Sequence, residues 1–243
     1  MNGQILVIGG GCMGVATAHH LLSCDPSLDV TVLERDPSLA RSSTLLSDGN
    51  VRIQFNLEEN IAISLYALEV LETFADDMAV GDHRPEVAMK KQGNLFLVDE
   101  EGEEAARAGL AQQLQMGARV EWMGPDEIAD RYPPLRSDRF IGGTFGPDDG
   151  SVDPTGVVQG LRRSAAARGA VMEAADVVGI DVEGGQVRGV RLADGARRGA
   201  DAVVVCAGAW STDLLATAGV EIPVVPVMRT VYVVSTDVGK GVE

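Results

Sequence analysis

The residues best suited to chemistry form a glycine-rich loop near the start of the chain. Gly9, Gly11 and Gly14 have G-x-G-x-x-G spacing and directly follow the apolar run Ile5–Ile8. In such a loop the first glycine makes a tight turn, the second lets the backbone approach a pyrophosphate, and the third lets helix and strand pack closely. Free amides at the helix start then favour a negative phosphate. The loop predicts a dinucleotide site, with a ligand-free glycine turn as the alternative.

An acidic residue stands where a dinucleotide site needs one. Glu34 lies 20 residues after Gly14, at the end of the apolar run Val30–Leu33. A carboxylate at this spacing accepts hydrogen bonds from ribose hydroxyls. Val15–Leu22, between the two apolar runs, has the pattern of a helix. The first 34 residues therefore predict a strand–helix–strand unit, in which the helix joins two parallel strands.

The order of segments after Glu34 favours a flavin over a nicotinamide dinucleotide. A polar arm follows over residues 41–49, and a sheet strand ending at Cys206 returns only after about 170 residues. In a nicotinamide dehydrogenase, strand–helix units would continue at similar spacing. The interrupted order fits a flavin held by a split domain, and an NAD-dependent dehydrogenase is the disfavoured alternative.

Several motifs in the same order resemble the D-amino-acid-oxidase-like FAD oxidoreductases. They are the glycine loop, Glu34-Arg35, Ala40–Thr44, Asp48–Arg52 and Cys206–Ser211. Ser43-Thr44 followed by Gly-x-x-Arg-x-Gln at 49–54 is most similar to the sarcosine- and glycine-oxidase-like members. The resemblance covers the whole chain. Family members continue further, so we expect this chain to lack the C-terminal part.

The resemblance implies FAD as the cofactor and a set of residues that contact it. That set is Gly9, Gly11, Gly14, Glu34, Arg35, Arg41, Ser42, Ser43, Thr44, Val177, Ala207 and Gly208. Arg52 is implied on the substrate side, where an arginine can form two charge-assisted bonds with a carboxylate. A solvated or salt-bridged Arg52 is the alternative, and Trp210 is expected to pack on the sheet. No catalytic residue and no metal site are predicted.

The resemblance also implies the activity, which is oxidation of the C–N bond of a small amino acid by hydride transfer to flavin N5. A secondary amine such as sarcosine or another N-methyl glycine is the expected substrate, with oxygen or another electron acceptor. A 2-hydroxy acid would need a base, usually a histidine, and none is well placed. The alternatives are an FAD-dependent 2-hydroxy-acid dehydrogenase, and a flavin-binding assembly or partner subunit, or inactive fragment, without turnover. Because residues 41–49 contain no histidine, we expect no histidyl flavin link there.

The expected fold class is α/β (α+β overall): a split Rossmann-like FAD-binding domain with an inserted mixed-sheet substrate domain. The FAD-binding domain would comprise residues 1–85 and 147–220, and the incomplete substrate domain 86–146 and 221–243. Further helices are expected at 57–75, 103–115, 125–131, 154–168 and 212–218. Further strands are expected at 94–98, 120–123 and 140–145, in a meander of 177–182, 187–192 and 202–206, and at 224–234. The last strand has no partner downstream, so a partner chain is expected to cover its edge.

Composition limits the class of protein. The chain has 243 residues, 45% of them hydrophobic, which is too apolar for a disordered chain. Its formal charge of −16 disfavours nucleic acid and anionic membrane surfaces as partners. Three cysteines without a C-x-x-C pair favour a reducing compartment. With no secretory signal and no membrane-spanning apolar stretch, we expect a cytoplasmic location.

Overall fold

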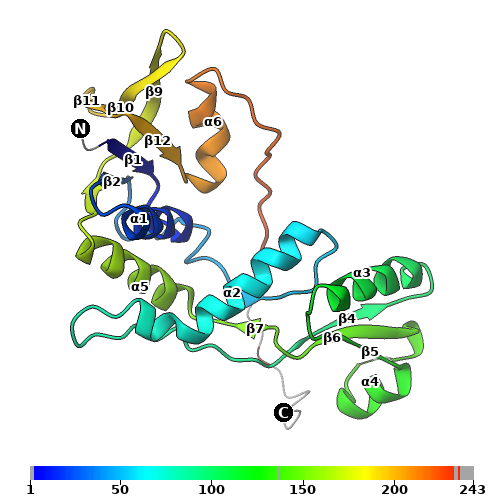
Figure 1. Cartoon of the computed structure of the whole chain (residues 1–243). Helices are drawn as coiled ribbons and strands as arrows, with labels where there is room; N and C mark the ends of the chain where they lie inside the picture. Colours follow the sequence, from blue (N-terminus) through cyan, green and yellow to red (C-terminus); the bar gives the residue numbers. More distant parts are fainter. Residues whose placement is uncertain (1–2, 136, 233–234, 236–243) are drawn as a thin grey trace. The chain divides into compact units, whose positions relative to one another are not determined.

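The computed structural model describes residues 3–135, 137–232 and 235 (Figure 1). Its chain forms two compact units. Unit 1 consists of Met1–Ser47, Phe74–Val87 and Asp153–Arg229, and unit 2 of Asp48–Thr73, Ala88–Val152 and Thr230–Glu243. The long helix α2 (Glu58–Asp77) contributes residues to both. The domain boundaries expected from the sequence stay a prediction.

A four-stranded parallel sheet forms the centre of unit 1. Its order is β12-β1-β2-β8, with bounds Ala202–Val205, Gln4–Ile8, Asp29–Glu34 and Val171–Ala174. The helices α1 (Cys12–Cys24) and α5 (Pro154–Ala167) lie side by side in Figure 1. They cover one face of the sheet through a core that includes Val7, Leu22 and Ala165. The strand–helix–strand prediction for the first 34 residues is confirmed.

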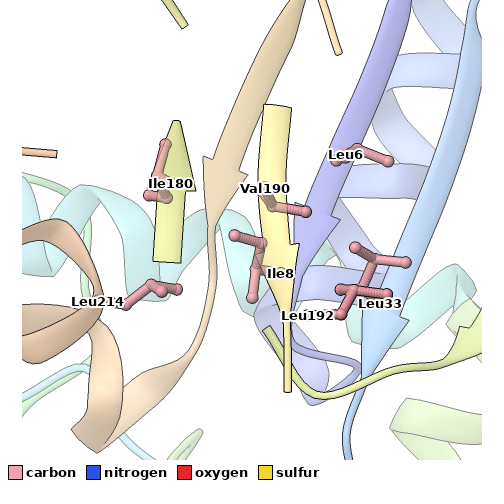
Figure 2. Packing of buried hydrophobic residues seen from close by; sticks show 7 residues of the cluster. All are labelled: Leu6, Ile8, Leu33, Ile180, Val190, Leu192 and Leu214. Carbon is pink, nitrogen blue, oxygen red and sulfur yellow. The ribbon is translucent and has the colours of Figure 1, made fainter. Parts of the chain in front are cut away.

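The other face of this sheet packs against a three-stranded antiparallel sheet of order β11-β10-β9 and a short helix. These elements are β9 (Val177–Glu183), β10 (Gln186–Leu192), β11 (Arg197–Gly199) and α6 (Ser211–Ala216), preceded by the 3-10 turn η2 (Gly208–Trp210). Figure 2 shows the shared core, to which all these layers contribute: Leu6, Ile8, Leu33, Ile180, Val190, Leu192 and Leu214. This packing fixes the end of β2 beside the start of β9.

The predicted meander is wrong in its third strand. Residues 202–205 pair in parallel with β1, and β11 takes the antiparallel place beside β10. The all-apolar run Ala202–Val205 fits a parallel sheet that is covered on both faces. A tight turn joins β9 to β10, where Gly184 and Gly185 have φ of 59° and 76°.

Unit 2 contains two antiparallel sheets. The larger has the order β4-β6-β5, and the smaller pairs β3 with β7. The strands are β3 (Asn50–Val51), β4 (Asn94–Val98), β5 (Glu121–Met123), β6 (Gly142–Gly146) and β7 (Gly150–Ser151). The helices are α3 (Glu103–Gln115), α4 (Pro125–Arg131) and the 3-10 turn η1 (Ser137–Arg139). Two small cores hold them together, one around Ile53 and Ile61 and one around Met123 and Phe145. The predicted α/β fold class is confirmed.

The end of the described chain differs from the prediction. Residues 221–232 form no helix or strand, and 233–234, the end of the expected strand, lie outside the described residues. No described strand pairs with 224–232, so its backbone groups lack the ladder that would define a strand. The side chain of Met228 there is 92% exposed. Among the described helices, none is both long and apolar enough to cross a bilayer.

Candidate functional site

The turn between β1 and α1 requires glycine at two positions. Gly9 has φ of 107°, and a side chain there would overlap the carbonyl oxygen of Cys206. At Gly14 a Cβ atom would overlap the carbonyl oxygen of Gly9, so α1 could not approach the loop. The amide of Gly9 donates to the carbonyl oxygen of Leu33 at 2.8 Å. These contacts hold the loop close to both neighbouring strands.

The start of α1 leaves backbone donors free. The amides of Gly11, Met13 and Gly14 have no hydrogen-bond acceptor among the described residues, and no side chain caps the helix at Gly11. The amide of Cys12 donates to Thr44 Oγ1 at 3.2 Å, which brings the polar arm against the loop. Three free N–H groups at the positive end of a helix are suited to an anion such as a phosphate.

Glu34 ties the end of β2 to the glycine loop. Its Oε2 accepts the amide of Gly10 at 2.7 Å, and its Oε1 accepts the amide of Asp36 at 2.8 Å. Each carboxylate oxygen has two lone pairs. One acceptor site on each oxygen is therefore left for another donor. A pair of ribose hydroxyls is the partner that the sequence predicts.

These elements enclose a cavity of about 740 Å³ in unit 1. This volume lies in the usual range for small-molecule sites. The cavity is lined by eleven of the twelve residues that the resemblance implies: Gly9, Gly11, Glu34, Arg35, Arg41, Ser42, Ser43, Thr44, Val177, Ala207 and Gly208. Gly14, the twelfth, lies behind the loop against Gly9. The structure thus brings together residues spread over about 200 positions, and their contact with a cofactor stays a prediction.

One cavity residue was not predicted to take part. The guanidinium of Arg35 lies over the Trp210 ring at 4.0 Å from its centroid, and that of Arg41 lies at 5.7 Å. The sequence suggested only that Trp210 packs on the sheet. Because Trp210 lies about 170 residues from both arginines, no local pattern could indicate this cation–π pair. The cavity lining contains these two arginines together with the carboxylates of Glu34, Asp36, Asp176 and Asp213.

Two cysteines also line the cavity. Cys12 begins α1, and Cys206 follows β12, with its Sγ 3.7 Å from Thr17 Oγ1. Burial raises the pKa of the Cys12 thiol, which therefore stays neutral at pH 7. Within the described part of the chain, no group of three His, Cys, Asp or Glu residues could hold a metal ion. These thiols fill space at the cavity wall.

Arg52 belongs to unit 2, directly after β3. Its guanidinium lies over the Phe55 ring at 4.5 Å and the Phe96 ring at 5.5 Å. No described carboxylate forms an ion pair with it, so the salt-bridged alternative is not what the structure contains. The N–H donors of Arg52 therefore remain available to a ligand.

Comparison with known proteins gives matches over nearly the whole chain. A family model described as DAO, FAD dependent oxidoreductase, matches residues 4–241. FAD-dependent oxidoreductase domain-containing protein 1 of Bos taurus is 29% identical, over 99% of this chain and 56% of its own length. Mitochondrial sarcosine dehydrogenase of Homo sapiens is 29% identical, over 96% of this chain and 25% of its own length.

A solved structure gives the same result for the fold. The crystal structure of L-proline dehydrogenase from P. horikoshii matches with a TM-score of 0.77 and 27% identity, over 90% of this chain and 56% of that chain. The present chain thus spans about half the length of the bovine relative and of this structure.

Proposed function

We propose a reaction for this chain, which belongs to the family of FAD-dependent oxidoreductases. The chain oxidises the carbon–nitrogen bond of a small secondary-amine amino acid. The observation that supports this substrate class is a chemical likeness between the substrates in the names of two similar proteins. Sarcosine, in the name of the human relative, is N-methylglycine, and L-proline, in the name of the P. horikoshii structure, carries its secondary amine in a ring. Both substrates combine a secondary amine with an α-carboxylate.

The residues of the cavity fit FAD. Gly11 has only Thr44 Oγ1 near the position of a side chain, at 3.4 Å from an added Cβ, so a ligand can reach the backbone there. The free amides of Gly11 and Met13 would bind the pyrophosphate, and Arg35 and Arg41 line the same cavity. Glu34 would accept hydrogen bonds from the ribose hydroxyls. When bound, FAD supplies the two-electron acceptor that the oxidation requires.

Arg52 would hold the carboxylate of the substrate. Its guanidinium carbon lies over the Phe55 ring at 4.5 Å and the Phe96 ring at 5.5 Å, while no described acidic side chain forms an ion pair with it. An arginine stacked in this way keeps its planar fork ready for a bidentate bond to a carboxylate. A neutral secondary amine needs no side-chain base to lose hydride, so the proposal requires no catalytic histidine.

Anaerobic reduction tests this proposal. The purified protein, loaded with FAD, is mixed without oxygen with sarcosine or L-proline, and with lactate as the 2-hydroxy acid. We expect the visible absorbance of the oxidised flavin to disappear with an amine and to persist with lactate. Bleaching with lactate alone would support a 2-hydroxy-acid dehydrogenase. A flavin that none of these compounds reduces would contradict the proposal and indicate a flavin-binding subunit without turnover.

A further inference from the structure

The segment 52–55, which carries Arg52, has no regular secondary structure, yet Ile53 within it is 1% exposed. Backbone groups in such a segment need hydrogen-bond partners that a strand or helix would otherwise supply. In this protein two buried polar side chains of unit 2, Asp149 and Gln113, supply them.

Asp149 is the first of these side chains. It is fully buried, between β6 and β7, and its Oδ1 accepts the backbone amide of Ile53 at 2.8 Å. Its Oδ2 accepts Gln54 Nε2 at 3.0 Å and Asn94 Nδ2 at 3.5 Å. Burial raises the pKa of Asp149, and these bonds together with the nearby charge of Arg52 act in the opposite direction. Burying a carboxylate lowers the stability of the fold unless the carboxylate oxygens accept hydrogen bonds. The hydrogen bonds of Asp149 therefore fix the positions of the groups that donate them.

Gln113 holds the other end of the segment. This residue of α3 is 5% exposed, and its Nε2 donates to the carbonyl oxygen of Phe55 at 2.9 Å. Gln54, between the two attachment points, donates to the carbonyl oxygen of Asn94 at 2.9 Å. The segment is therefore attached to β4, α3 and the β6–β7 turn. Phe55 and Phe96, the rings that face Arg52, lie on two of the elements joined in this way.

We propose that Asp149 and Gln113 are positioning residues for substrate binding. By fixing the backbone of 53–55 they hold the Arg52 guanidinium on Phe55 and Phe96, with its N–H groups directed to a substrate carboxylate. The inference rests on the proposed function of Arg52. It adds two residues that touch neither the substrate nor the cofactor. Both act through Arg52.

Acetate and acetamide test the proposal, because they have the same size and differ in charge. Calorimetric titration of the FAD-loaded protein measures both affinities in the wild type and in the variants Arg52→Ala, Asp149→Asn and Gln113→Leu. We expect Arg52→Ala to weaken acetate binding about tenfold or more. Asp149→Asn and Gln113→Leu should each weaken it several-fold, and acetamide binding should change in none of them.

The double variants show whether the effect passes through Arg52. In the Arg52→Ala background, Asp149→Asn and Gln113→Leu should cause no further loss of acetate affinity. Asp148→Asn is the matched control. The partly buried Asp148 pairs with Lys91 and Arg119 and bonds to none of residues 52–55. The acetate affinity of this variant should therefore equal that of the wild type. Melting temperatures identify a variant that does not fold, and the other positioning variant then carries the test.

The outcomes separate the two proposals. Unchanged acetate affinity in Arg52→Ala, or no acetate binding by the wild type, would overturn the role of Arg52 itself. A clear loss in Arg52→Ala with wild-type affinity in the folded positioning variants would overturn only the present inference. The same would follow from a loss that persists in the Arg52→Ala background. A protein that binds acetate through Arg52 but is not reduced by any amine would contradict the proposed reaction alone.

Discussion

At the scale of single residues, we expect two glycines of the loop to have different roles: Gly14 is needed for folding and Gly11 for binding the cofactor. We predict that Gly14→Ala lowers the free energy of unfolding of the FAD-free protein by about 1–3 kcal/mol. The added methyl group would overlap the carbonyl oxygen of Gly9 and push α1 away from the loop. Urea unfolding measures the loss. A wild-type midpoint would show that the loop can move aside, contrary to the packing described.

Gly11→Ala should leave the stability of the protein nearly unchanged and weaken FAD binding. An added Cβ would lie 3.4 Å from Thr44 Oγ1, an ordinary contact, so unfolding should change by less than about 1 kcal/mol. The same methyl group occupies the space through which a pyrophosphate approaches the backbone. We therefore expect FAD affinity to fall by at least about tenfold, or about 1.4 kcal/mol, in a fluorescence titration. Wild-type affinity would show that the pyrophosphate does not lie at Gly11.

His19 gives the protein a defined pH dependence. It is 5% exposed in α1, and its Nδ1 has no hydrogen-bond partner among the residues that the structure describes. Burial lowers its pKa from 6.5 to about 4, helped by the charges of His20 and Arg168 and opposed by Asp77. The unfolded chain then binds the proton more readily between pH 6.5 and 4. The contribution of His19 to stability is complete above pH 6.5 and is lost as the pH falls, by up to about 1.4 kcal/mol per pH unit.

We predict that His19→Leu flattens this slope in urea unfolding measured from pH 7.5 to 4.5. His83→Gln, at an exposed turn of the same unit, serves as the control and should keep the wild-type slope. Equal slopes in His19→Leu and the wild type would mean that His19 takes up its proton in the folded protein as readily as in the unfolded chain.

At the scale of elements, the start of α5 depends on one carboxylate. The side chain of Asp153 accepts the amide of Thr155 at 2.9 Å and caps the helix, and Pro154 occupies its first position. We predict that Asp153→Ala lowers the free energy of unfolding by about 1 kcal/mol. Asp82→Ala, in an exposed turn of the same unit, should change it by less than about 0.5 kcal/mol. Equal effects would show that the loss reflects charge and not the cap.

The sequence predicted the elements whose causes are local. The apolar runs that became β1 and β2, the periodic stripe that became α2 and the proline that begins α5 all act within a few residues. The place of residues 202–205 beside β1, about 200 residues away, fits the returning sheet strand expected from the split-domain order, whereas the meander expected from local pattern put this strand beside the wrong neighbour. The strand expected at 224–234 had suitable side chains, but a strand also needs a neighbour, and nothing in the local pattern supplies one.

In the candidate site, too, the features with local causes were predicted and those that join distant segments were not. The glycine loop and Glu34 follow a spacing rule, and the arm and Val177 followed from the resemblance. The Trp210 stack on Arg35 could not be predicted, because it joins distant segments through side-chain packing alone. In the sequence, Asp149 is the second of two acids before a glycine, a pattern that indicates only a turn. Its bond to the Ile53 amide joins segments about 100 residues apart, so only the structure shows it.

At the scale of the whole molecule, the account depends on one cavity. The chain has a formal charge of −16, and FAD is also an anion, so overall electrostatics oppose binding. In the proposed site, free amides at the start of α1 and the guanidinium groups of Arg35 and Arg41 would attract the pyrophosphate, against the carboxylates of Glu34, Asp36, Asp176 and Asp213 in the same lining. All of these groups lie in unit 1, so binding should need no residue of unit 2.

The visible absorption spectrum of the purified chain, after incubation with FAD and desalting, tests this claim most directly. We predict a retained flavin spectrum close to one FAD per chain, and its loss in Gly11→Ala, measured in parallel with circular dichroism to confirm folding. A folded wild-type chain that emerges colourless would contradict the account, since the loop, Glu34 and the arm would then not form a cofactor site.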